Sequence, residues 1–178
     1  MQGLLEIPGK LFSDNRGSFT EVYNEKLADK LGVDDFFVQD NFSVSAEKNT
    51  IRGLHAQTGK FAQSKLVRCL KGAIIDVVVD IRPDSSSFLE WMAFELSEEK
   101  ANGLYIPTGF LHGFQTLVDG CCVFYKCGAQ YAPESEITVH FADPRLSIDW
   151  VQFGSDAVIS EKDRQGISIA DLFKASGN

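Results

Sequence analysis

The hexapeptide RGLHAQ, Arg52 to Gln57, places a histidine between two stretches whose residues are typical of β-strands. The chain has 178 residues and three histidines. A histidine in this setting can be a metal ligand, a general base, or a hydrogen-bonded residue of the interior. A run that bears Arg and Lys, QSKLVRCLKG, begins a few residues later and bears on which of these chemistries applies.

The histidine spacing does not favour a metal site. A three-histidine site commonly begins with His-x-His on one strand face, but the second residue after His55 is Gln57. His112 and His140 each stand alone, although ligands from separate strands could still converge and carboxylates could complete a site. Chemistry without a metal is therefore the preferred interpretation.

Several cationic or polar side chains lie in or beside apolar strand runs, where an unpaired charge is costly. They are Arg52, Lys65, Arg68, His112, Tyr125 and Lys126. A barrel that houses several cations is expected to bind an anion, and the planar fork of Arg suits phosphate oxygens. This grouping weakens the simpler reading of His55 as a buried residue without a reactive role.

The elements that must position these side chains are mostly strands. Strand patterns cover 36–45, 64–82 (two strands joined at Lys71-Gly72), 89–96, 103–107, 112–118, 121–131 and 137–141. Helical periodicity is limited to 24–32 and 169–176, and SEKDRQG reads as a loop. Many short, closely spaced strands predict an all-β fold, a jelly-roll β-barrel with a few short helices. At this length we expect residues 1–178 to form a single domain.

Composition excludes several classes of function. The net charge of -8 argues against nucleic acid as a main partner. The N-terminal residues lack the basic start of a signal peptide, and no apolar run is long enough to span a membrane. We therefore expect a cytoplasmic protein without a membrane partner. The four cysteines form no Cys-x-x-Cys pair and are interpreted as small buried apolar residues.

The order of the motifs resembles one family. The matching segments are DNRGSF, VQDNFSVS, IRGLHAQ, AQSKLVRCLKG, DVVVDIR, IPTGFLHGF, FYKC, YAPESE and DPRLSIDW. In this order and at these spacings the chain resembles the dTDP-4-dehydrorhamnose 3,5-epimerases, cupin-type jelly rolls that act on nucleotide-linked keto sugars. The resemblance implies inversion of C3 and C5 of dTDP-4-dehydro-6-deoxy-D-glucose, without a cofactor or metal.

The resemblance also implies roles for individual residues. It makes His55 the base, Tyr125 the acid, Lys65 the lysine beside the reacting sugar, and Asp163 the partner of the histidine. Substrate-binding positions fall on Arg16, Glu21, Gln39, Asp40, Asn41, Arg52, His112, Glu136 and Lys162. In the family the segment of Arg16 and Glu21 typically comes from a partner subunit, so a homodimer is implied.

These residue types suit the chemistry. Protons on carbons beside a ketone are acidic enough for imidazole to remove, provided that the enolate is stabilised. A carboxylate would hold the imidazole tautomer, and a positive Lys65 near the C4 oxygen would stabilise the enolate. Tyr125 has a phenolic proton to return on the opposite face.

Simpler readings of single residues stay open. Tyr125 could be a hydrogen-bonded barrel residue with Tyr131 as its competitor, Asp163 a solvated charge, and Arg16 a turn residue before Gly17. Asp76 and Asp80 are inward candidates without an assigned role.

Other functions also stay open. Ala56 and Phe42 depart from the family pattern and leave a C3-only epimerase of another 4-keto-6-deoxysugar as an alternative. A ketoisomerase is disfavoured by Gln57, which stands where that group carries a second histidine. A non-catalytic sugar-nucleotide-binding cupin and a metal-dependent cupin enzyme are the remaining candidates.

Overall fold

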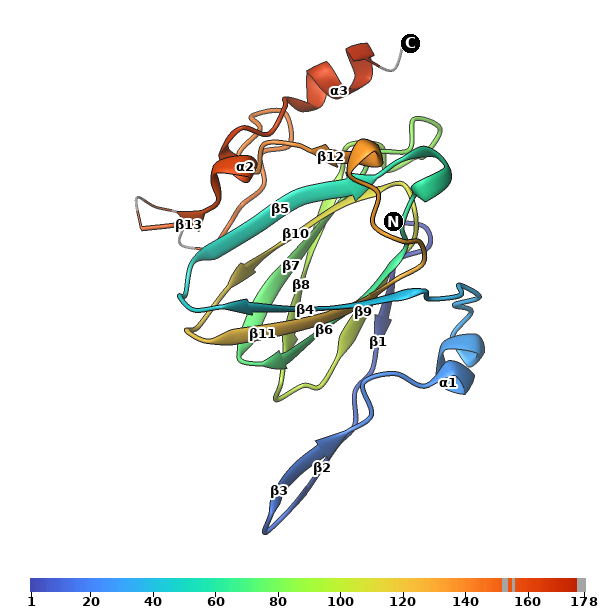
Figure 1. The fold of residues 1–178 in the computed structure, drawn as a ribbon, viewed down its shortest axis with the longest axis vertical. Helices are drawn as coiled ribbons and strands as arrows, with labels where there is room; N and C mark the ends of the chain where they lie inside the picture. Colours follow the sequence, from blue (N-terminus) through green and yellow to red (C-terminus); the bar gives the residue numbers. More distant parts are fainter. Residues whose placement is uncertain (152–153, 155, 176–178) are drawn as a thin grey trace.

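A computed structural model describes residues 1–151, 154 and 156–175. Two sheets form a barrel (Figure 1), which confirms the predicted jelly roll. The five-stranded sheet has the order β1 (Leu5–Ile7), β9 (Gly103–Ile106), β6 (Lys65–Lys71), β11 (Cys121–Cys127) and β4 (Gln39–Ser45). The second sheet has the order β12 (Glu136–Thr138), β5 (Thr50–Gln57), β10 (Phe110–Thr116), β7 (Ala73–Asp80) and β8 (Trp91–Ser97), with β13 (Val158–Ile159) parallel to β5.

The core explains why the sequences of β7 and β10 are almost continuous apolar runs. One cluster, which includes Val67, Val78 and Phe114, draws its side chains from both sheets. The other cluster packs the opposite face of the second sheet, including Leu111, against the C-terminal segment, including Ile169. A strand buried on both faces loses the apolar–polar alternation of a half-exposed strand.

The helices are short. Helix α1 (Glu25–Lys30) begins at Asn24, whose side chain accepts a hydrogen bond from the backbone of Leu27. Helices α2 (Glu161–Arg164) and α3 (Ile169–Ala175) follow the barrel, and single 3-10 turns occupy 59–61 and 133–135. Among the described residues, none of the helices is long and apolar enough to cross a membrane.

A hairpin stands away from the barrel. Strands β2 (Leu11–Asp14) and β3 (Gly17–Thr20) pair only with each other, and Figure 1 shows them as an extension beyond the sheets. We call residues 11–20 the arm. The turn is possible because Gly17 has φ +135°, a value that side-chain-bearing residues rarely adopt.

Most predicted strands are confirmed, including β6 and β7 joined at Lys71-Gly72. Two local expectations are wrong. RGLHAQ lies within β5 and not between strands, and SEKDRQG contains helix α2 and is not a loop. The predicted C-terminal helix is confirmed as α3, while Ser176 lies outside the described residues. Three of the four cysteines are buried as expected, but Cys122 is partly exposed.

Candidate active site

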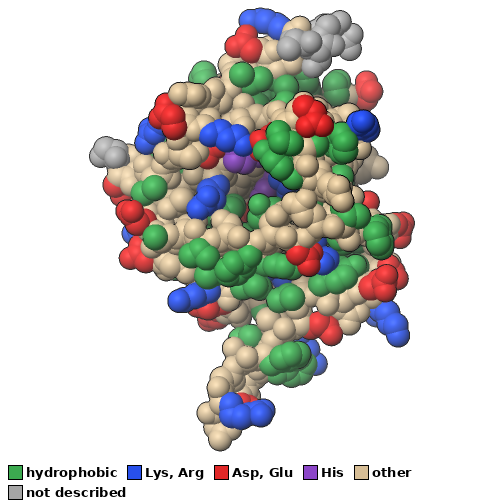
Figure 2. All heavy atoms as spheres, in the orientation of Figure 1, with side chains coloured by type: hydrophobic (Ala, Val, Ile, Leu, Met, Phe, Trp, Pro, Cys, Tyr) green, Lys and Arg blue, Asp and Glu red, His purple; other side chains and the backbone are tan. Residues whose placement is uncertain are grey.

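A cavity of about 250 Å³ opens in the barrel beside helix α2. Its walls come from β4, β5, β6, β10, β11 and α2, so both sheets contribute. The lining residues are Ser43, Arg52, His55, Lys65, His112, Phe114, Tyr125, Ser160, Lys162 and Asp163. Figure 2 shows histidine side chains in a hollow of this face, with Lys and Arg side chains beside it. All four predicted catalytic residues therefore lie around one cavity.

A β-bulge in β5 directs Arg52 and His55 into this cavity. On β10 their partners Phe114 and His112 are two positions apart, whereas Arg52 and His55 are three apart. The bulge falls at Gly53, whose φ is +125°, and a Cβ there would lie 2.6 Å from the Cα of Gly113. Glycine is required because the two backbones touch. In a regular strand, residues three positions apart would point to opposite faces, so the extra residue is what keeps both side chains on the cavity side.

His55 and Asp163 form the central pair of the site. His55 Nε2 lies 2.6 Å from Asp163 Oδ1, and the Asp163 side chain is 4% exposed. Ser160 Oγ accepts the backbone N–H of Asp163 and so holds the first turn of α2. Burial works to raise the pKa of Asp163, but hydrogen bonds from His55, Ser160 and Gly53 hold it below its usual value. The carboxylate therefore stays charged beside the imidazole.

Lys65 and Tyr125 enter the cavity from the five-stranded sheet, on neighbouring strands β6 and β11. Burial lowers the pKa of Lys65, and the charges of Cys127, Asp76 and Glu136 oppose that shift. Burial also raises the pKa of Tyr125, so its phenol keeps its proton at neutral pH. The cavity thus holds a phenolic proton donor and the Lys65 amine on the sheet opposite that of His55.

His112 is the second histidine of the cavity and pairs directly with His55 across β10 and β5. Its Nε2 lies 2.8 Å from Oδ2 of Asp76, which is fully buried on β7. Burial lowers the pKa of His112, while Asp76 acts in the opposite direction. His112 is consequently held as a neutral, oriented imidazole.

A polar bridge closes one rim of the cavity. Lys162 Nζ lies 2.6 Å from Glu136 Oε2, which also accepts the hydroxyl of Tyr131 at 2.9 Å. Burial works to raise the pKa of Glu136, but these two partners hold it below its usual value. Tyr131 is exposed and bonded here, outside the cavity lining, so Tyr125 is the tyrosine placed to act on a ligand.

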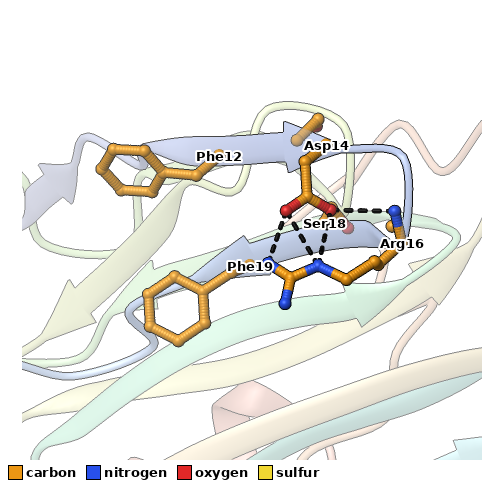
Figure 3. A pocket seen from close by; sticks show the side chains of 7 residues that line it. Phe12, Asp14, Arg16, Ser18 and Phe19 are labelled. Atoms are coloured by element: carbon orange, nitrogen blue, oxygen red, sulfur yellow. Dashed lines mark hydrogen bonds and ion pairs between the residues drawn. The ribbon is translucent and has the colours of Figure 1, made fainter.

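Other predicted binding residues are not brought to the cavity. Arg16 binds Asp14 at the tip of the arm (Figure 3), and Glu21 accepts a hydrogen bond from Asn24. On β4, Gln39 donates to Asn41, which donates to the Cys127 sulfur. Asp40 pairs with Lys126 at 2.6 Å.

Two of the cationic residues expected near the anion lie elsewhere. Arg68 is three residues from Lys65 on β6, so alternation places it on the other face, where it donates to the carbonyl of Ala101. Lys126 follows Tyr125 directly and points away for the same reason. Their contribution to the cavity was a wrong expectation.

Sequence reasoning missed three residues that line the cavity, Ser43, Phe114 and Ser160. Asp76 was an inward candidate without an assigned role, and the structure pairs it with His112. A signal existed for Ser160, because a serine three residues before Asp163 is a helix N-cap pattern. Among the described ranges, no three His, Cys, Asp or Glu side chains gather in a way that could hold a metal ion.

The fold and the site define a jelly-roll enzyme of acid–base type, with a histidine–carboxylate pair and a tyrosine facing one cavity. A family model of dTDP-4-dehydrorhamnose 3,5-epimerase matches residues 1–171. The dTDP-4-dehydrorhamnose 3,5-epimerase of Escherichia coli K12 is 42% identical over 175 residues. The aligned region covers 98% of this chain and 94% of the Escherichia coli protein. The chain belongs to the dTDP-4-dehydrorhamnose 3,5-epimerase family.

Solved structures agree with this assignment. A crystal structure of dTDP-6-deoxy-D-glucose-3,5-epimerase from Legionella pneumophila, in complex with dTDP-4-keto-L-rhamnose, has a TM-score of 0.91 and 41% identity. The aligned region covers 99% of this chain and 92% of the Legionella chain. A 3'-monoepimerase from Streptomyces bikiniensis, in complex with dTDP-quinovose, has a TM-score of 0.86 but only 29% identity. The aligned region covers 98% of this chain and 87% of the Streptomyces chain.

Proposed function

We propose that the protein inverts C3 and C5 of dTDP-4-dehydro-6-deoxy-D-glucose and so produces dTDP-4-dehydro-L-rhamnose. The observation that carries the proposal is the His55–Asp163 pair, 2.6 Å apart, in one cavity with Lys65 and Tyr125. The higher identity to 3,5-epimerases than to the single-centre enzyme supports two inversions over one.

In the proposed mechanism His55 is the base. Its Nε2–H donates to Asp163, which leaves Nδ1 free to take a proton from the carbon beside the C4 ketone. Electrons of the broken C–H bond move to the C4 oxygen and form an enolate, and Asp163 stabilises the imidazolium. The ammonium of Lys65 stabilises the negative charge on that oxygen.

Tyr125 then returns a proton to the carbon. Since His55 comes from one sheet and Tyr125 from the other, removal and return on opposite faces of the sugar are favoured. Return from the opposite face inverts the centre. His55 then gives its proton to solvent and Tyr125 takes one back, after which the same steps invert the second of C3 and C5. The reaction needs no cofactor or metal.

The cavity suits the sugar, and its cations suit the diphosphate. A volume of about 250 Å³ lies near the lower end for small-molecule sites, so the hexose fills it and the nucleotide extends outward. Arg52 and Lys162 are the cations available to phosphate oxygens. Further contacts are proposed for His112, Glu136, Gln39, Asp40 and Asn41, and for Arg16 and Glu21 of a partner subunit.

We also propose a homodimer. The arm exposes Phe12 and Phe19, of which Phe19 is 68% exposed, and β4 exposes Phe42 and Val44 at the edge of its sheet. Insertion of the arm along a partner's sheet would cover apolar surface and satisfy an open strand edge. Figure 3 places Phe12 and Phe19 on neighbouring strands of the arm, with Arg16 at its tip.

A cytoplasmic location and a role in making dTDP-L-rhamnose for cell-surface polysaccharide complete the proposal. All four cysteines are free thiols, which supports a reducing compartment. Cell fractionation followed by immunoblotting tests the location.

The test of the activity is proton NMR of dTDP-4-dehydro-6-deoxy-D-glucose in D₂O with EDTA-treated protein. Loss of both the C3 and C5 proton signals is expected. Loss at C3 alone would indicate the single-centre alternative, and no exchange would overturn the epimerase assignment. His55→Asn is the matched variant, which should abolish exchange at both carbons while dTDP binding persists.

A further inference from the structure

Behind the cavity wall lies a buried carboxylate that the proposed reaction does not use. Asp76 is fully buried on β7, and its Oδ2 lies 2.8 Å from His112 Nε2. Its other oxygen, Oδ1, is buried without a hydrogen-bond partner among the described residues. An incompletely paired buried carboxylate is costly, so its presence requires an explanation beyond packing.

Asp76 affects two side chains of the cavity, His112 and Lys65. His112 has its Nε2 on Asp76 and itself lines the cavity, so its Nδ1 remains for a ligand or a neighbouring side chain. Lys65 also lines the cavity and, within the described part of the chain, forms no ion pair with a carboxylate. Asp76 is one of the charges that favour the ammonium form of Lys65.

We propose that Asp76 is a positioning residue for the reaction, which holds His112 in the Nε2–H tautomer and balances the charge of the Lys65 ammonium. The inference rests on the proposed function, because Lys65 acts there on the C4 oxygen. Asp76 does not touch the sugar. It acts through its hydrogen bond to His112 and through its charge on Lys65, and His112 then presents Nδ1 as a hydrogen-bond acceptor.

The matched variants are Asp76→Asn and Asp80→Asn. Both remove a buried carboxylate from β7 and keep nearly the same shape, but Asp80 binds Arg82, Ser85 and Ser87 and lies outside the cavity lining. Asp76→Asn should lower kcat about 10- to 100-fold, by analogy with carboxylates that orient metal-bound histidines, with the Kd for dTDP unchanged. Asp80→Asn should lower stability and leave kcat unchanged.

Two further readouts separate positioning from a structural role. With three histidines in the chain, ¹⁵N-histidine NMR resolves each imidazole, and His112 should show Nε2–H in the wild type. A double-mutant cycle of Asp76→Asn with Lys65→Gln should be non-additive, with Asp76→Asn costing less once Lys65 is gone than it does in the wild type, and the remaining cost reflecting His112.

The outcomes are distinct. An Nδ1–H tautomer in the wild type, additive effects in the cycle, or equal loss of kcat in Asp80→Asn would overturn the proposal. Failure of the wild type to exchange protons would instead overturn the proposed function, because the tautomer measurement needs no substrate.

Discussion

Asp163 Oδ1 lies 2.6 Å from His55 Nε2, although the two residues are 108 positions apart in the chain. The aspartate is presented by helix α2, which Ser160 caps, and the histidine by a bulged strand. Because the carboxylate is almost fully buried, its interaction with the imidazole is weakly screened. The pair is therefore the part of the site most sensitive to loss of a single charge.

Replacing Asp163 by Asn keeps the shape of the side chain and removes the charge. We expect kcat for deuterium incorporation to fall by up to about 10⁴-fold, because the imidazole loses its tautomer and the support for its charged form. Initial rates by NMR measure the loss, and calorimetric titration of dTDP controls for binding. A variant that keeps wild-type kcat would remove Asp163 from the mechanism.

The alkaline limb of the pH–rate profile should belong to Lys65. Its pKa is lowered by burial, so the ammonium is lost, and kcat falls, as pH rises through a value below the usual 10.4 or so. Burial raises the pKa of Tyr125, so that phenol stays protonated beyond the same range.

Two variants assign this limb. In Lys65→Arg the guanidinium stays charged, so the residual activity should lose the limb. In Tyr125→Phe the rate should fall by about 10²- to 10⁴-fold at every pH while the limb stays in place. A limb that disappears in Tyr125→Phe would contradict the assignment.

Asp80 should stabilise the fold in a pH-dependent way. Burial works to raise its pKa, but hydrogen bonds from Arg82, Ser85 and Ser87 hold it well below the usual value. Its contribution is thus complete above about pH 4, and it is lost as pH falls toward the pKa of the folded state. We expect Asp80→Asn to lower the free energy of unfolding by about 3 kcal/mol at pH 7. Urea denaturation should give a smaller difference from wild type at pH 3, and an equal difference at both pH values would count against this account.

The arm should control the oligomeric state. Phe19→Glu places a charge on its exposed apolar surface, and we expect a shift from dimer to monomer, because a buried unpaired charge opposes association. Light scattering coupled to size exclusion measures the mass. Val118→Glu, at an exposed apolar residue between β10 and β11, is the control and should leave the mass unchanged. A dimer that survives Phe19→Glu would place the interface elsewhere.

The elements with strong local signals were predictable. The run 64–82 contains two strands because it is rich in β-branched residues and is broken at Gly72, which has φ +78°. Helix α1 follows from the Asn24 cap and the apolar spacing after it. The short helix α2 was missed, since four residues give too little periodicity to distinguish a helical turn from a loop.

Which side chains meet was predictable only in part. The motif order located His55, Lys65, Tyr125 and Asp163, and the structure gathers them around one cavity. Strand register decided the remainder: the bulge at Gly53 turns Arg52 and His55 to the same side, while alternation turns Arg68 away. The pairing of Asp76 with His112 likewise depends on β7 and β10 being neighbours.

The sequence by itself determined the residue types, their order, the strand-rich pattern and hence the jelly roll. Only the tertiary structure decided that a bulge turns Arg52 and His55 to one side, that Asp76 pairs with His112, and that the arm leaves the barrel. The physical reason is that local preferences act over a few residues, whereas a one-residue change in strand register reverses the direction of every side chain that follows.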